Sequence, residues 1–169
     1  MIKMCGIIML ISGTAGLGFF ASRKLGMRTK TLQSLLECLE MIEWELETNM
    51  PPTKQLFREV SVRVSAPASL FIIECMSKME SDEYSLSEMW NQAAEEQLTA
   101  LKPEDLEVLL PVGAVLGRYD ADSQRNAITA AHNRLDMHWK DSIAEKKRLG
   151  RLYNTLGVMV GIFLVIIFL

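Results

Sequence analysis

Histidine and cysteine are scarce in this chain, which has 2 His and 3 Cys among 169 residues. His132 and His138 are six positions apart, so on one helix they point in different directions and make poor joint metal ligands. Cys5, Cys38 and Cys75 form no C-x-x-C pair, and an odd number cannot close a disulfide framework. We therefore expect no metal site, two solvated or half-buried histidines, and Cys38 and Cys75 as small core residues in a reducing compartment.

Motifs that carry catalysis or cofactor binding are also missing. No glycine-rich run has the spacing of a phosphate-binding loop. Asp120 and Asp122 lack the glycine and the downstream glutamate of a calcium loop. No serine or cysteine lies in a nucleophile motif. The sequence therefore predicts a non-enzymatic protein without a cofactor.

Positive charge is confined to a few places. The formal net charge is -3, from 18 Lys and Arg against 21 Asp and Glu. Eight of the basic residues lie in two clusters beside the apolar ends, so only ten remain for the rest of the chain. A nucleic-acid-binding protein would gather its basic residues on a recognition face, so we exclude that role. The two clusters are Arg23, Lys24, Arg28 and Lys30, and Lys146, Lys147, Arg148 and Arg151.

Long uncharged apolar runs lie at both ends. Residues 4–22 contain no charge, and a helix of this length spans about 28 Å, close to the hydrocarbon thickness of a membrane. A cleaved signal peptide, with a small-residue site at Gly13 to Ala15, is the alternative for this segment. The basic cluster that follows opposes translocation of the next residues, which favours an uncleaved anchor. Residues 152–169 are likewise uncharged and long enough to cross.

The positions of the basic clusters predict a topology. Each cluster lies on the inner side of its apolar segment, and positive flanks stay in the cytoplasm. We therefore divide the chain into an N-terminal transmembrane helix (1–22), a cytoplasmic helical domain (23–151) and a C-terminal transmembrane helix (152–169). In the last segment Gly157 and Gly161 form a G-x-x-x-G pair, which favours close helix packing, either with the first segment or with another copy.

The middle of the chain has helical periodicity and no strand alternation, which predicts an all-α fold: a six-helix bundle with short loops. Ser85 to Glu88 has the form of a capping box, Pro103 suits a first helical turn, and Asp120 or Asp122 caps the last helix. Pro111 could kink the fifth helix. The first expected helix spans 31–47. The second is opened by Pro51 or Pro52 and carries Leu56, Phe57 and Val60, and the third is opened by Pro67 and carries Leu70, Phe71, Ile73 and Met76. The last three span 85–101, 102–117 and 123–150.

Acidic side chains gather on two surfaces that we predict to contact a partner protein, with plain solvation as the alternative. One surface lies along the first bundle helix and the other near a helix junction. A partner held by such faces would be captured in a salt-dependent way. The candidates are Glu37, Glu40, Glu43 and Glu47 on the first surface, and Glu95, Glu96, Glu104, Asp105 and Glu107 near the junction.

The stretch LGRYDADSQ at residues 116–124, a long helix, and the ending KKRLGRLYNTLGVMVGIFLVIIFL together resemble the stage III sporulation protein AB family. The apolar start, the basic step at Arg23 and Lys24, and a first helix ending EWELETNMPP fit the same family. The resemblance covers essentially the whole chain, and its motifs are not catalytic. It is most specific at Leu116, Gly117, Asp120 and Gln124, and at Leu156 and Gly157 to Gly161.

The resemblance implies a scaffold that acts in sporulation, at the mother-cell membrane facing the forespore, in a transenvelope complex. It also implies a soluble part similar to the six-helix cytoplasmic domain of type II secretion F proteins, which sit beside an assembly ATPase. Expected partners are therefore the membrane, other subunits of the complex including a secretion-type ATPase, and further copies of the chain. The alternative is a membrane-tethered adaptor or sensor outside any secretion system.

Overall fold

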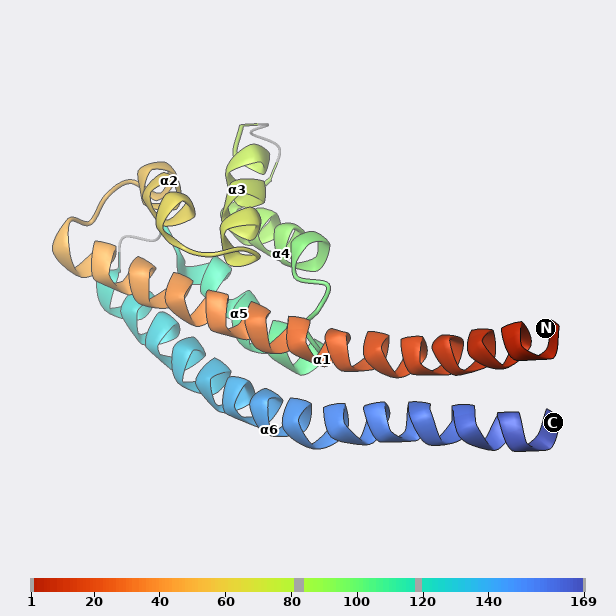
Figure 1. Ribbon diagram of the computed structural model, residues 1–169. Helices are drawn as coiled ribbons and strands as arrows, with labels where there is room; N and C mark the ends of the chain where they lie inside the picture. Colours follow the sequence, from red (N-terminus) through yellow and green to blue (C-terminus); the bar gives the residue numbers. More distant parts are fainter. Residues whose placement is uncertain (1, 81–83, 118–119, 169) are drawn as a thin grey trace. The chain divides into compact units, whose positions relative to one another are not determined.

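The computed structural model describes the backbone of residues 2–80, 84–117 and 120–168, and within these ranges the side chains of 23–152 and of 155, 156, 159, 160 and 163. Every element in these ranges is an α-helix (Figure 1). The helices are α1 (Ile2–Thr48), α2 (Thr53–Arg63), α3 (Ala68–Lys78), α4 (Leu86–Gln97), α5 (Pro103–Val115) and α6 (Ala121–Phe168).

The all-α prediction is confirmed, and the six expected bundle helices correspond one to one with α1 to α6. Helices α1 and α6 continue without a break through the segments predicted to flank the bundle, as the lack of a helix breaker before Gly150 predicts for the last helix. Neither junction contains a proline or a pair of glycines to interrupt the backbone hydrogen bonds. Among the residues that the structure describes, no helix holds a stretch long and apolar enough to cross a membrane.

The chain divides into two compact units. Residues 30–140 form one unit, called the bundle below, which contains α2 to α5 and the adjoining halves of α1 and α6. Residues 1–29 and 141–169 form the other, called the helix pair. Within the bundle α1 and α6 run antiparallel, side by side (Figure 1), since Glu40 contacts His132 while Glu47 contacts Arg125.

The core of the bundle is built around Trp90 of α4. Its side chain is buried, and its ring lies 4.6 Å from Phe71 in an edge-on arrangement and 6.1 Å from Phe57. The indole N–H donates to the carbonyl of Leu109 at 3.1 Å, so the one polar atom of the ring is paired. Gly113 leaves room for the ring, because a Cβ there would lie 2.4 Å from it.

The apolar face of α3 differs from the one the sequence predicts. The structure buries Phe71, Ile72 and Cys75, whereas Leu70 and Ile73 are each half exposed. Leu70, Phe71, Ile72 and Ile73 are consecutive apolar residues, so the periodicity fits two registers. The register is decided by packing: Ala68 at the start of α3 is buried, and its N–H donates to Ser34 of α1 at 3.3 Å.

Caps define the ends of α4 and α5. Ser85 accepts from the N–H of Glu88 at 3.3 Å and its own N–H donates to the Glu88 carboxylate at 2.8 Å, so the predicted capping box is confirmed. The predicted end of α4 at Leu101 is four residues too late. The chain leaves the helix at Leu98, whose N–H still donates to the carbonyl of Ala94, and turns before Pro103 starts α5.

The two described cysteines behave as core residues. Cys38 and Cys75 are buried and free. Burial raises the pKa of the Cys38 thiol to about 12 and also raises the pKa of Cys75, so both stay protonated at neutral pH. The side chain of Cys5 lies outside the described residues.

Candidate functional site

One end of the bundle contains a hollow of about 770 Å³, called the end groove below. Its walls come from segments far apart in the sequence: the end of α1, the loop at 49–52, the start of α2, the turn after α5 and the start of α6. Apolar side chains form much of its surface, and charged side chains stand beside them. The apolar lining includes Leu46, Met50, Pro51, Pro52 and Leu56, and the charged lining is Glu43, Glu47, Asp122 and Arg125.

Local backbone geometry opens the groove on the α1 side. The N–H groups of Asn49 and Met50 both donate to the carbonyl of Glu45, which closes the last turn of α1. Met50 then takes a positive φ of 41°, and Pro51 and Pro52 keep the chain extended before α2 begins. The Met50 side chain is left 64% exposed beside the groove.

On the opposite side, the turn after α5 depends on glycine. Gly117 has a φ of 78°, a left-handed conformation that side chains disfavour. A Cβ at this position would also lie 3.1 Å from Leu86 and 3.2 Å from Thr53. Arg118 and Tyr119, which follow, lie outside the described residues.

Asp120 and Ser123 then set the start of α6. The carbonyl of Asp120 accepts from the N–H of Gln124 at 3.2 Å, and the hydroxyl of Ser123 donates to the Asp120 carboxylate. These hydrogen bonds from Ser123 hold the pKa of Asp120 below its ordinary value. Of the two caps that the sequence allows, Asp120 is therefore the residue at the helix start.

The acidic face of α1 lies against α6. Glu47 and Arg125 form an ion pair at 2.6 Å, Glu43 accepts from Thr129 at 2.6 Å, and Glu40 lies 3.0 Å from His132. Glu37 lies apart from these contacts and accepts from Ser65 at 3.0 Å. Two of the four predicted partner residues, Glu43 and Glu47, therefore line the end groove, while Glu40 and Glu37 lie progressively farther along α1.

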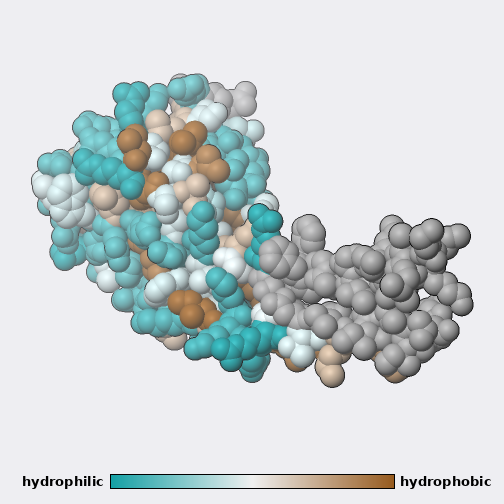
Figure 2. Space-filling model, in the orientation of Figure 1, coloured by the Kyte–Doolittle hydropathy of each residue, from teal (hydrophilic) through white to brown (hydrophobic). Residues whose placement is uncertain are grey.

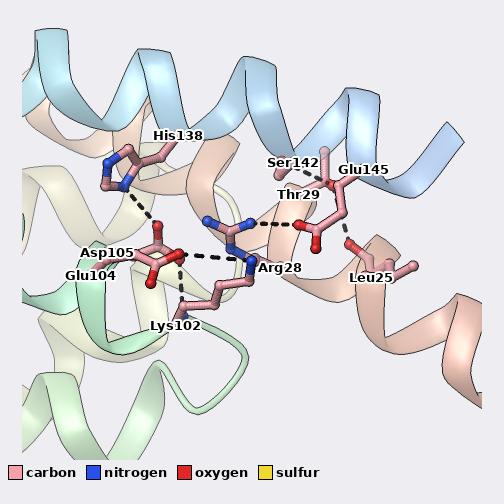
Figure 3. A network of polar contacts seen from close by, with 9 residues as sticks. All are labelled: Leu25, Arg28, Thr29, Lys102, Glu104, Asp105, His138, Ser142 and Glu145. Atoms are coloured by element: carbon pink, nitrogen blue, oxygen red, sulfur yellow. Dashed lines mark hydrogen bonds and ion pairs between the residues drawn. The ribbon is translucent and has the colours of Figure 1, made fainter. Parts of the chain in front are cut away.

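The second acidic surface does not come together as predicted. Asp105 is buried, accepts from the N–H of Lys102 at 2.9 Å and lies 2.8 Å from Nδ1 of His138, so it presents no surface to a partner (Figure 3). Glu104 is exposed and lies 3.7 Å from Nζ of Lys102. Glu107 is exposed on α5. Glu95 and Glu96 belong to the end of α4, where Glu96 pairs with Lys78 of α3 at 3.1 Å.

The histidines occupy separate positions, both partly exposed. Each lies next to one carboxylate, His132 by Glu40 and His138 by Asp105. Across the described residues, no three His, Cys, Asp or Glu side chains come together in a way that could hold a metal ion.

Polar contacts join the two helices of the helix pair. Arg28 and Glu145 form an ion pair at 3.0 Å, in which the Arg28 side chain is only 8% exposed. The hydroxyl of Ser142 donates to Thr29 at 3.1 Å, and Thr29 in turn donates to the carbonyl of Leu25 (Figure 3). The surroundings of Gly157 and Gly161, predicted to pack in this unit, lie outside what the structure describes.

A family model matches almost the whole chain, over residues 3–169, and its description is stage III sporulation protein AB. The chain belongs to the stage III sporulation protein AB family. A solved structure titled "Stage III sporulation protein AB (SpoIIIAB)" shares the fold, with a TM-score of 0.64 and 21% identity over 72% of this chain and 98% of that one. No curated protein matches the chain.

In this member of the stage III sporulation protein AB family, four of the residues that carried the resemblance lie at one end of the bundle, whereas Leu156 and Gly157 to Gly161 belong to the helix pair. Gly117 and Gln124 line the end groove, Asp120 starts the helix that forms one wall, and Leu116 is buried below the turn. Sequence reasoning missed the groove itself. The Met-Pro-Pro stop and the isolated Gly117 were its only signals, and neither shows that the two segments are neighbours.

Proposed function

We propose that the chain is a non-enzymatic, membrane-anchored scaffold: a platform subunit of a secretion-like complex that acts on the mother-cell side during endospore formation. Membership of the stage III sporulation protein AB family supports the sporulation role. The end groove supports the scaffold role, since its lining combines apolar and charged side chains from several helices.

The chemistry of the end groove is that of a protein-docking site. Interfaces combine an apolar centre with a polar rim, and aromatic, Met and Arg side chains are enriched in them. Here Met50 and Leu46 supply apolar surface, and Glu47 and Arg125 stand at the side in an ion pair. We assign this groove to another subunit of the complex, with a secretion-type ATPase as the first candidate.

The exposed side chains near the end of α6 support membrane anchoring. The segment from Leu152 to Phe168 carries no charge, and the large apolar side chains that the structure describes in it are exposed. Exposed apolar side chains are unfavourable in water and suit lipid. The described ones are Leu152, Leu156, Met159, Val160 and Phe163.

Two methionines of equal exposure test the docking role. Met50 is 64% exposed in the groove and Met137 is 65% exposed on α6 outside it. Met50→Glu should reduce heat-resistant spores and weaken capture of the purified ATPase subunit about tenfold or more, because it places a charge on the apolar lining. Met137→Glu should leave both unchanged. If the Met50→Glu chain still captures the ATPase subunit normally but spore formation fails, the result would favour an adaptor outside the secretion complex.

Topology is tested separately. With both termini outside the cytoplasm and the bundle inside, a cysteine appended after Leu169 should react with a membrane-impermeant thiol reagent in intact protoplasts of non-sporulating cells that produce the chain. A cysteine introduced at exposed Met137 should react only after lysis. Labelling of the appended cysteine only after lysis would contradict the proposed hairpin topology.

A further inference from the structure

The helix pair is strongly basic, whereas the bundle is acidic. Residues 1–29 and 141–169 include eight Lys and Arg but only two acidic residues, Asp141 and Glu145, so their side chains sum to +6. Of the 18 basic and 21 acidic residues of the chain, 10 and 19 are left for the bundle, which sums to -9. Six of the eight basic side chains of the helix pair are exposed and are called the basic band below: Arg23, Lys24, Lys146, Lys147, Arg148 and Arg151.

The charges of the basic band are not neutralised within the chain. Glu145 is already paired with the nearly buried Arg28 at 3.0 Å. Among the residues that the structure describes, none forms an ion pair with a member of the band. Figure 2 shows strongly hydrophilic residues gathered on the described part of the helix pair. Like charges on neighbouring turns of a helix repel each other, so an anion bound among them would stabilise the band.

Basic groups of the two helices meet at Gly26. A Cβ at this position would lie 3.5 Å from Cε and 3.7 Å from Nζ of Lys146, so the ammonium group of this α6 residue lies over the backbone of α1. Arg23 precedes Gly26 by three residues, which places it on the same face of α1. Arg23 and Lys146 therefore bring one positive charge from each helix to a common face of the helix pair.

The chain next to the basic band is apolar on both helices. Residues 4–22, before Arg23, and residues 152–169, after Arg151, contain no charged side chain. The side chains of Leu152 and Leu156 are 49% and 46% exposed. A ligand with a negative head and long apolar chains matches both features. A soluble anion, a nucleic acid or an acidic protein would use only the charges.

We propose that Arg23 and Lys146 form a binding site for the phosphate of an anionic phospholipid, whose acyl chains lie along the uncharged segments. The proposal rests on the membrane anchoring of the proposed function. A guanidinium and an ammonium group both pair with phosphate oxygens through charge-assisted hydrogen bonds. Basic side chains from two adjacent helices at the cytoplasmic edge of a membrane suit such a headgroup. The other four members of the band add attraction over about 8 Å at physiological salt.

Lipid binding by the full-length chain in a neutral detergent tests the site. The chain is mixed with phosphatidylglycerol or with phosphatidylcholine of identical acyl chains, and native mass spectrometry measures how many lipids each chain retains. The wild-type chain should bind phosphatidylglycerol at least about tenfold more tightly, because only this headgroup has a net negative charge. The double variant Arg23→Gln with Lys146→Gln should lose this preference.

Two further double variants serve as controls. Arg23→Lys with Lys146→Arg exchanges the two groups but keeps both charges, so the preference should survive. Lys54→Gln with Arg58→Gln removes two exposed charges from α2 of the bundle and should leave the preference unchanged. Loss of the preference in the α2 variant would show a response to total charge and would overturn the site.

Flotation with vesicles of pure phosphatidylcholine separates this site from the proposed anchoring. A chain that floats with them, but binds both lipids equally or keeps its preference without Arg23 and Lys146, overturns the lipid site alone. A chain that does not float contradicts the anchoring and the site together. Phosphatidylglycerol that is displaced by inorganic phosphate, duplex DNA or polyglutamate at equal negative charge would assign the band to a soluble anion, a nucleic acid or an acidic protein. Each of these displacements would also overturn the proposal.

Discussion

The bundle and the helix pair place their apolar and polar side chains in opposite ways. In the bundle the largest apolar side chains are buried, with Trp90 packed against Phe57 and Phe71. In the helix pair the described apolar side chains near the end of α6, such as Phe163 at 63% exposed, face outward. In the described part of the helix pair, the two helices are linked by polar contacts: the ion pair of Arg28 with Glu145 and the hydrogen bond of Ser142 with Thr29.

The difference shows which interactions the structure describes in each unit. Burial of apolar surface stabilises the bundle, and close packing around one aromatic residue makes it specific. In the described part of the helix pair, hydrogen bonds and an ion pair link the two helices, close to where they leave the bundle.

The largest effect should come from truncating the centre of the bundle. Trp90→Ala removes both aromatic contacts and the hydrogen bond to Leu109, so we expect the free energy of unfolding to fall by about 3–5 kcal/mol. Trp44 is the control, because it is half exposed and the guanidinium of Arg63 lies 6.0 Å from the centroid of its ring. Trp44→Ala should cost less than about 1 kcal/mol. Equal losses in chemical denaturation would show that Trp90 is not the centre of the core.

Two glycines sharpen the comparison directly, one in each unit. A Cβ at Gly113 would lie 2.4 Å from Trp90, whereas a Cβ at Gly26 would lie 3.5 Å from the Lys146 side chain, an ordinary contact. Gly113→Ala should therefore destabilise the chain by about 1–3 kcal/mol through overpacking, and Gly26→Ala should be neutral or slightly stabilising. Thermal unfolding followed by circular dichroism measures both. A tolerated Gly113→Ala would mean that the core is looser than its contacts suggest.

Each unit contains an ion pair, and the two pairs allow the polar contacts of the units to be compared. Arg28 is nearly buried beside Glu145, while Arg125 and Glu47 are 61% and 45% exposed. Glu145→Gln should cost about 1–2 kcal/mol, because it weakens a charge-assisted bond to a poorly solvated guanidinium. Glu47→Gln should cost less than about 1 kcal/mol, and its effect should shrink in high salt. If the effects of both variants shrink equally in high salt, the Arg28–Glu145 pair is no better shielded from solvent than the exposed pair.

The smallest effect concerns a helix cap in the bundle. Hydrogen bonds from Ser85 lower the pKa of Glu88 from its ordinary value of 4.5. A lowered pKa means that this contact stabilises the fold above about pH 4.5 and is lost as the pH falls through the folded-state pKa. Ser85→Ala should therefore cost about 1 kcal/mol at pH 7 and less at pH 3. A cost that does not depend on pH would show that the Ser85 hydroxyl does not contribute to the lowered pKa of Glu88, since the backbone N–H of residue 85 still donates to Glu88 in this variant.

Most helix starts could be predicted from local signals in the sequence. Prolines at 51, 52, 67 and 103 and the Ser85 to Glu88 box mark starts that the structure confirms, because caps and breakers act over one turn and need no distant partner. The error at Leu70 and Ile73 has the opposite origin. Four consecutive apolar residues fit two helical registers, and only the packing of Ala68 against Ser34 of α1 selects one.

The candidate site was only partly predictable. The sequence predicts Glu43 and Glu47 as candidates for partner contact, and the resemblance points to Gly117 and Gln124. No local signal shows that these residues, about seventy positions apart, are neighbours. Asp105 was predicted to lie on an acidic surface. The structure buries it beside His138, because a carboxylate in the first turn of α5 can cap that helix and meet α6 at once.

The sequence alone determined the helical class, the number of bundle helices, most of their starts and the family. Periodicity, caps and family motifs each depend only on residues close together in the chain. The tertiary structure alone decided which face of each helix is buried, that Gly113 makes room for Trp90, and that the end of α1 meets the start of α6 to form the end groove. Those outcomes depend on contacts between side chains distant in sequence, whose energies exist only once the helices pack.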